Sequence, residues 1–214
     1  MSKRTVRAVA LALSMIASLH AAKLPRPAPP FSINLPDGKE LALSGYKGKV
    51  VALAFILTTC PHCQNYSRML NKMQHEFSAQ GLQVVASAIE ENAKPAVPGF
   101  IRAYAPPYPV GYNDTMLVSD FLENPRTKVL HMPVIVFIDR QGTILGQYQA
   151  GEPFIEANTE QNLRNTILGI LRGTITPATV RKDEAEAAKK KPSVTYMTEQ
   201  IPGKGAPPKA APKK

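Results

Sequence analysis

The chain contains only two cysteines, Cys60 and Cys63, which stand in the segment Thr-Cys-Pro-His-Cys at 59–63. Two thiols at this spacing can form a reversible disulfide, bind a soft metal ion or act as a structural crosslink. A disulfide between them would close a very short loop and would constrain little of the unfolded chain, which disfavours a structural crosslink. The spacing therefore favours a redox-active dithiol.

The surrounding sequence places this pair where a thiol is easily ionised. The apolar run 49–57 predicts a buried strand, and the residues after it have the spacing of an amphipathic helix, with Pro61 in its first turn. Unpaired N–H groups and the helix dipole at such a helix start favour a thiolate on Cys60. We therefore expect Cys60 to be the nucleophile and Cys63 the resolving thiol, with the ring of His62 further favouring the thiolate.

Metal binding is the main alternative for two such thiols. A zinc site would need four ligands, and besides the cysteines the body of the chain offers only His62, His75 and His131, with no second C-x-x-C motif. Copper(I) is a closer alternative, because two thiolates with His131 or Met132 nearby would suit that ion. The redox interpretation itself needs no metal and no other cofactor.

The two ends of the chain differ from its body. In residues 1–22, three basic residues precede an apolar run and small residues, which predicts a secretory signal or an uncleaved N-terminal anchor. We therefore expect an exported protein, periplasmic or held on the outer side of a membrane, which it touches only if this segment is uncleaved. Eight of the ten net positive charges lie in residues 1–22 and 181–214. The nearly neutral body argues against a nucleic-acid-binding protein.

The length suits one domain with extensions. We expect a proline-rich spacer at 23–30, the domain at 31–175, and a disordered, basic tail rich in Lys, Ala and Pro at 176–214, with at most a short helix at 182–190. Within the domain, apolar periodicity and turn residues predict the following elements: a hairpin at 31–43, strands at 49–57 and 82–89 around a helix beginning at Pro61, short helices near 99–104 and at 115–123, a hairpin at 133–148, and a helix at 159–172.

In this order the chain resembles the exported thioredoxin-fold thiol-disulfide oxidoreductases of the TlpA/ResA type, within the redoxin superfamily. The resemblance rests on PPFSINLPDGKELALSGYKGKVVALAF, the C-x-x-C motif, GLQVVASAIEEN, YPVGYND and HMPVIVFIDRQGTILGQYQAG. It implies an α/β thioredoxin-like fold, in which helices flank a central mixed sheet and an N-terminal β-hairpin extends it. The implied partners are exported proteins that carry disulfides or thiols, together with a redox partner, and the protein is expected to be a monomer.

The resemblance also implies roles for individual residues. Cys60 would attack a substrate disulfide to give a mixed disulfide, and Cys63 would then resolve it. Pro133 matches the family's cis-proline, which lies against the dithiol, and Met132 would offer its backbone to a bound substrate strand. Thr59, Pro61 and His62 would support the pair.

Three departures from the family pattern bear on the chemistry. Thr59 replaces the usual Trp before the first cysteine, and Ala54 stands where thioredoxin has a buried Asp that can take the proton of Cys63. The inner Pro-His pair resembles the strongly oxidising bacterial disulfide-forming enzyme, whereas the body resembles proteins that are mostly reductants. The reduction potentials of these extremes differ by about 150 mV, so the direction of electron flow stays open at this point.

Two rivals share the redoxin scaffold. A thiol peroxidase usually has Pro and Thr or Ser seven and three residues before its reactive cysteine, but these positions hold Leu53 and Leu57. A copper carrier of the Sco type has three residues between its cysteines, whereas Cys60 and Cys63 are separated by two. Both functions remain as alternatives.

Overall fold

The computed structural model describes residues 23–125 and 127–190. The leader expected at 1–22 and the tail from 191 onward lie outside the described residues. None of the helices in the described part is long and apolar enough to cross a membrane. In chain order the elements are β1 (Arg26–Pro27), β2 (Ser32–Asn34), β3 (Glu40–Ala42), η1 (Leu43–Tyr46), β4 (Val50–Ile56), α1 (Pro61–Phe77), η2 (Ser78–Gln80), β5 (Leu82–Ala88), α2 (Ala93–Tyr104), β6 (Val110–Tyr112), α3 (Thr115–Phe121), β7 (Val134–Ile138), β8 (Thr143–Gln149), α4 (Pro153–Glu156), α5 (Thr159–Leu171) and α6 (Pro177–Lys190).

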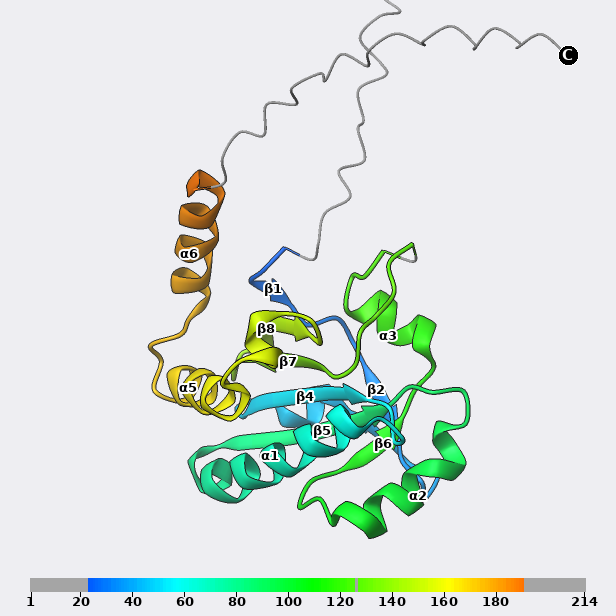
Figure 1. The fold of residues 1–214 in the computed structure, drawn as a ribbon. Helices are drawn as coiled ribbons and strands as arrows, with labels where there is room; N and C mark the ends of the chain where they lie inside the picture. Colours follow the sequence, from blue (N-terminus) through cyan, green and yellow to red (C-terminus); the bar gives the residue numbers. More distant parts are fainter. Residues whose placement is uncertain (1–22, 126, 191–214) are drawn as a thin grey trace, which may run out of the picture.

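The strands form one mixed sheet in the order β1-β8-β7-β4-β5-β6-β2-β3 (Figure 1). β4 and β5 are parallel and are joined through α1, in the strand–helix–strand order that the sequence predicts, whereas β7 runs antiparallel to β4. The predicted N-terminal hairpin is present as β2 and β3. The carboxyl ends of β4 and β5 and the start of β7 consequently lie together at one end of the strands, in the middle of the sheet.

Every residue of β4 is buried, which explains the unbroken apolar run in its sequence. Successive side chains of a strand point to opposite faces. Ala52 and Ala54 pack in a core with α1, α2 and α5, while Leu53 and Phe55 pack in a second core with α3. Because both faces are covered, the strand cannot alternate between apolar and polar residues.

The second helix is longer than the sequence predicts. α2 begins at Ala93, although only a short helix near 99–104 is expected from the proline-rich sequence. Pro95 stands in the first turn, where its missing N–H group removes no helical hydrogen bond. Pro98 lies inside the helix, and the burial of Ala93, Val97 and Phe100 offsets the bond that it removes.

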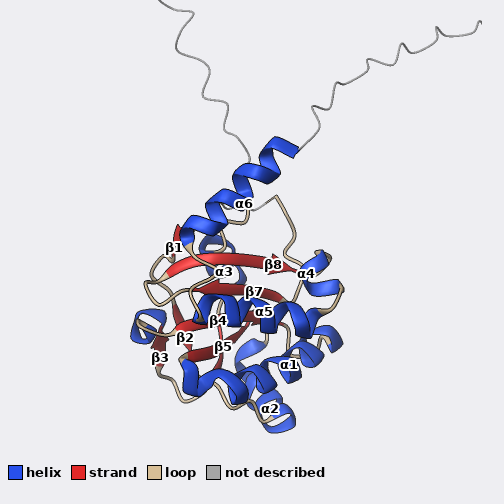
Figure 2. Ribbon diagram, turned by 90° about the vertical axis from the view of Figure 1, so that its left-hand side faces the viewer, coloured by secondary structure: helices blue, strands red, loops and turns tan. Residues whose placement is uncertain are grey.

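The two ends of the described chain also differ from expectation. The expected spacer contributes β1, which pairs with β8 at the sheet edge. The expected short helix at 182–190 is part of α6, which begins at Pro177 and extends away from the sheet and the other helices (Figure 2). Apolar contacts of Ile175 and Val180 with the core hold its base, and the N–H group of Leu24 donates to Oε1 of Glu184 at 3.2 Å.

Candidate functional site

The two cysteines lie at the start of α1, immediately after the turn that follows β4. Cys60 is the N-cap residue and Pro61 the first residue of the helix, as the sequence predicts. The N–H group of Cys63 donates to Sγ of Cys60 at 3.4 Å, so one of the free donors of the helix start points at this sulfur. Both cysteines are free thiols, and the structure therefore represents the reduced dithiol.

The surroundings of the two sulfurs differ. Cys63 is completely buried, whereas Cys60 is partly exposed. The pKa of Cys63 is raised to about 12, chiefly by burial and to a smaller extent by the Cys60 sulfur and the Glu90 carboxylate. The N–H group of Leu57 opposes this shift by donating to the Cys63 sulfur at 3.4 Å. Cys63 therefore holds its proton at neutral pH, and Cys60 is the sulfur that a substrate can reach.

Beside the dithiol lies the carboxylate of Glu90, a residue that was not predicted from the sequence to belong to the site. Glu90 follows β5, and its Oε1 accepts hydrogen bonds from the N–H group of Thr58, at 2.9 Å, and from the Thr58 hydroxyl. Within the described part of the chain, its Oε2 is buried and has no hydrogen-bond partner. The position of Glu90 could have been inferred, because carboxyl ends of neighbouring parallel strands meet at one sheet edge.

The other predicted site residues lie around the carboxyl ends of β4 and β5. The Met132–Pro133 peptide bond is cis, and Val134, which follows it, pairs with Phe55 near the end of β4. Pro133 is buried and Met132 is half-buried. Thr59, Pro61, His62 and His131 are exposed, and in the described ranges no group of three or more His, Cys, Asp and Glu side chains is placed to hold a metal ion.

An apolar groove of about 580 Å³ adjoins the dithiol. Its lining includes Met132, Glu90 and Leu57, and the N–H group of Leu57 donates to the Cys63 sulfur. Met116 of α3 and Val129 of the loop before β7 also line it, and these residues are 56% and 75% exposed. Exposed apolar groups beside a reactive thiol are typical of a surface that binds another protein.

Known proteins resemble this chain in sequence. It is 35% identical to the thiol-disulfide oxidoreductase ResA of Bacillus subtilis over 114 residues, which cover 48% of this chain and 63% of that protein. It is 26% identical to the protein of the same name from Bacillus cereus over 119 residues, which cover 55% of this chain and 65% of that protein. The chain thus matches slightly less than two thirds of the length of each relative.

The fold also matches solved structures. A thiol:disulfide interchange protein of the thioredoxin family from Chlorobium tepidum superposes with a TM-score of 0.59 at 24% identity, over 71% of this chain and 99% of that one. This likeness confirms the predicted α/β thioredoxin-like fold. Residues 24–147 match the AhpC/TSA family, a span that contains β1 to most of β8 and both cysteines. The chain belongs to the AhpC/TSA family.

Proposed function

We propose that the protein is an exported thiol-disulfide oxidoreductase that exchanges electrons with the disulfides of other exported proteins. The observation that carries the proposal is the asymmetric dithiol, in which a partly exposed Cys60 caps the helix and a buried, protonated Cys63 lies one turn behind it. This arrangement suits attack by one sulfur and release by the other. The names of the two Bacillus relatives agree with this activity.

The exchange consists of two displacements at sulfur. The Cys60 thiolate attacks one sulfur of a substrate disulfide, whose S–S bond breaks as the Cys60–substrate bond forms, and the released sulfur takes a proton from water. Cys63 then loses its proton and attacks Sγ of Cys60, which releases the second substrate thiol. The substrate gains two electrons, and the protein is left with a Cys60–Cys63 disulfide that a dithiol partner reduces again.

Glu90 has a place in the second displacement. Cys63 must lose its proton before it can attack, and Ala54 supplies no carboxylate beneath the pair. The charge of Glu90 acts on Cys63, and its Oε2 is free of hydrogen bonds within the described residues. We assign Glu90 as the group that receives this proton as the mixed disulfide is resolved.

Assays of the purified protein test the proposed activity against its rivals. We expect the reduced protein to reduce the disulfides of an unfolded substrate protein, or the oxidised protein to form them in a reduced one. A measured reduction potential for the Cys60–Cys63 pair then tells which direction prevails with a given partner. Rapid consumption of hydrogen peroxide, or stoichiometric Cu(I) binding, without any disulfide exchange would contradict the proposal.

Replacing Glu90 by Gln should separate the two displacements. The Glu90 charge raises the pKa of Cys63, so its removal should lower that pKa and allow alkylation of Cys63 at a less alkaline pH. Loss of the proton acceptor should also slow the resolution of a preformed mixed disulfide about a hundredfold. Mass spectrometry of alkylated protein and stopped-flow kinetics measure the two effects. Glu40→Gln, which removes an exposed carboxylate of β3, serves as the control.

A further inference from the structure

We propose that Arg26 is a positioning residue for this reaction, holding the loop made of the described residues 122–125 and 127–132, which forms one wall of the groove beside the dithiol. The inference rests on the proposed function and assigns to the N-terminal segment a part in binding the substrate protein. Arg26 stands in β1, at the edge of the sheet, and does not contact the cysteines through any hydrogen bond or ion pair found in the structure.

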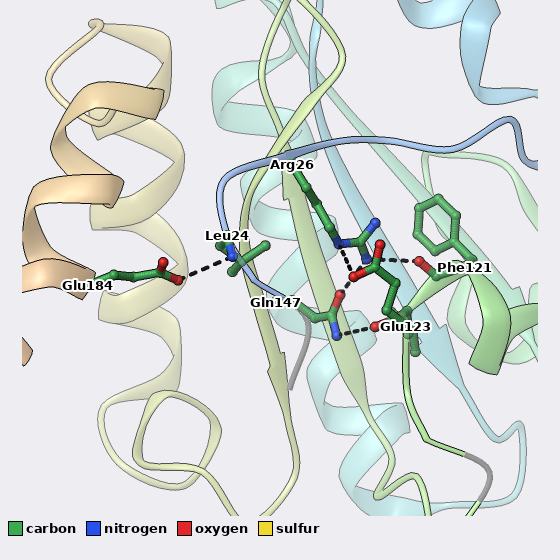
Figure 3. Close-up of polar contacts among 7 residues, drawn as sticks. Leu24, Arg26, Phe121, Glu123, Gln147 and Glu184 are labelled. Carbon is green, nitrogen blue, oxygen red and sulfur yellow. Dashed lines mark hydrogen bonds and ion pairs between the residues drawn. The ribbon is translucent and has the colours of Figure 1, made fainter. Parts of the chain in front are cut away.

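The Arg26 guanidinium is buried at the end of α3, where it joins three parts of the chain. Its side chain is 9% exposed, and its Nη2 donates to the carbonyl oxygen of Phe121 at 2.8 Å and to Oε1 of Gln147 at 3.2 Å. Its Nε lies 3.6 Å from Oε2 of Glu123, and Figure 3 shows these groups converging on the guanidinium. Among the described residues, Nε and Nη1 are buried without a hydrogen-bond partner, so the ion pair with Glu123 and the two hydrogen bonds from Nη2 offset the cost of burying this charge.

Two glutamines of β8 hold the two ends of the loop, and Arg26 contacts one of them. Gln147 donates from Nε2 to the carbonyl oxygen of Leu122 at 2.9 Å, at the start of the loop. Gln149, two residues further along β8, accepts from the N–H group of His131 at 3.3 Å, at its end. Residues two apart on a strand share a face, so one row of side chains on β8 holds both ends. By donating to Oε1 of Gln147, Arg26 orients the side chain that holds the start of the loop.

Polar contacts matter here because apolar packing under the loop is incomplete. A cavity of about 160 Å³ lies at its base, lined by Leu122, Glu123, Leu130 and Gln147. The same loop supplies Val129 and Leu130 to the substrate groove. A shift of the loop would therefore change the groove, while the cysteines stay in place on the turn and helix that follow β4.

The N-terminal segment that carries Arg26 is itself anchored on its other side. Leu24 donates its N–H group to Glu184 of α6, and Figure 3 shows the segment lying between α6 and the end of α3. Because Arg26 belongs to this segment, a displacement of the segment would also displace the contacts that hold the loop. The segment follows directly on the expected leader at 1–22.

Kinetics of the full chain with Arg26→Gln test the proposal. We expect KM for the disulfides of an unfolded protein to rise about tenfold, with kcat and the reduction potential of the Cys60–Cys63 pair unchanged. The rate with oxidised glutathione, which is too small to use the groove wall, should also stay unchanged. Arg26→Lys should give an intermediate KM, because an ammonium keeps the charge but cannot donate in the planar geometry of a guanidinium. Arg102→Gln, which removes an exposed arginine of α2, is the matched control.

Amide hydrogen exchange gives a readout that does not depend on activity. The amides of residues 122–124 and 127–131 should exchange at least about tenfold faster in Arg26→Gln than in Arg102→Gln, while those of α1 keep their protection. If Arg26→Gln does not fold, Gln147→Ala should produce the same changes. Unchanged KM and loop exchange, or a parallel loss of the glutathione reaction, would overturn the proposal. If the wild-type protein exchanges no protein disulfide, the proposed function fails, and loop exchange alone decides whether Arg26 holds the loop.

Discussion

Cys60→Ser is expected to abolish disulfide exchange, with a loss of at least about a thousandfold in the rate of attack on a substrate disulfide. The serine hydroxyl is not ionised at neutral pH and cannot form a disulfide, and the remaining Cys63 is buried and protonated. Stopped-flow or turbidity assays with an unfolded disulfide-containing protein measure the loss.

Controls for this variant must exclude an effect on folding. A serine at position 60 can still act as the N-cap residue, because its hydroxyl oxygen can accept a hydrogen bond from the N–H group of Cys63. The temperature of thermal unfolding should therefore change little. Normal exchange by Cys60→Ser, or attack that depends on Cys63 alone, would show that the two sulfurs have the opposite roles.

Cys63→Ser should have a different effect, because it leaves the attacking sulfur in place and removes the resolving one. We expect the first displacement to proceed and the mixed disulfide between Cys60 and the substrate to accumulate, with multiple turnover reduced by about a hundredfold or more. Non-reducing electrophoresis and mass spectrometry of the trapped species identify the sulfur involved.

The same variant offers a way to find substrates. Exported proteins linked to Cys63→Ser through Cys60 should be released by a reductant, and the double variant with Cys60→Ser should trap none of them. Failure of Cys63→Ser to form any mixed disulfide with a protein that the wild type reduces would contradict the two-step mechanism.

Much of the scaffold follows from local sequence. The run around β4 is apolar throughout because both faces of that strand are buried, and the C-x-x-C motif with Pro61 marks the start of α1. By contrast, the length of α2 is underestimated, because its prolines have a low helix propensity. The burial of its apolar residues stabilises the helix, and this tertiary effect is not visible in local sequence. The pairing of β1 with β8 joins residues more than 110 positions apart, which local patterns do not reveal.

The candidate site also contains residues that the sequence predicts and residues that only the structure reveals. The order and spacing of Cys60 and Cys63 are visible in the sequence, and the structure places both where the motif predicts. The parallel pairing of the two strands places Glu90 near the dithiol, but its hydrogen bonds with Thr58 depend on side-chain orientation, which the sequence does not reveal. Arg26 was missed because burial, and not its residue type, distinguishes it from the exposed basic residues Lys23 and Lys182.

The arrangement of Glu90 has a further consequence for how this protein can diverge. The attacking and resolving sulfurs belong to one strand–helix unit, whereas the carboxylate comes from the segment that follows the next strand. Substitutions at that strand end can thus adjust how fast a captured partner is let go without altering how readily it is captured. Related proteins could in this way acquire long-lived or short-lived covalent complexes while their two-cysteine motif remains the same.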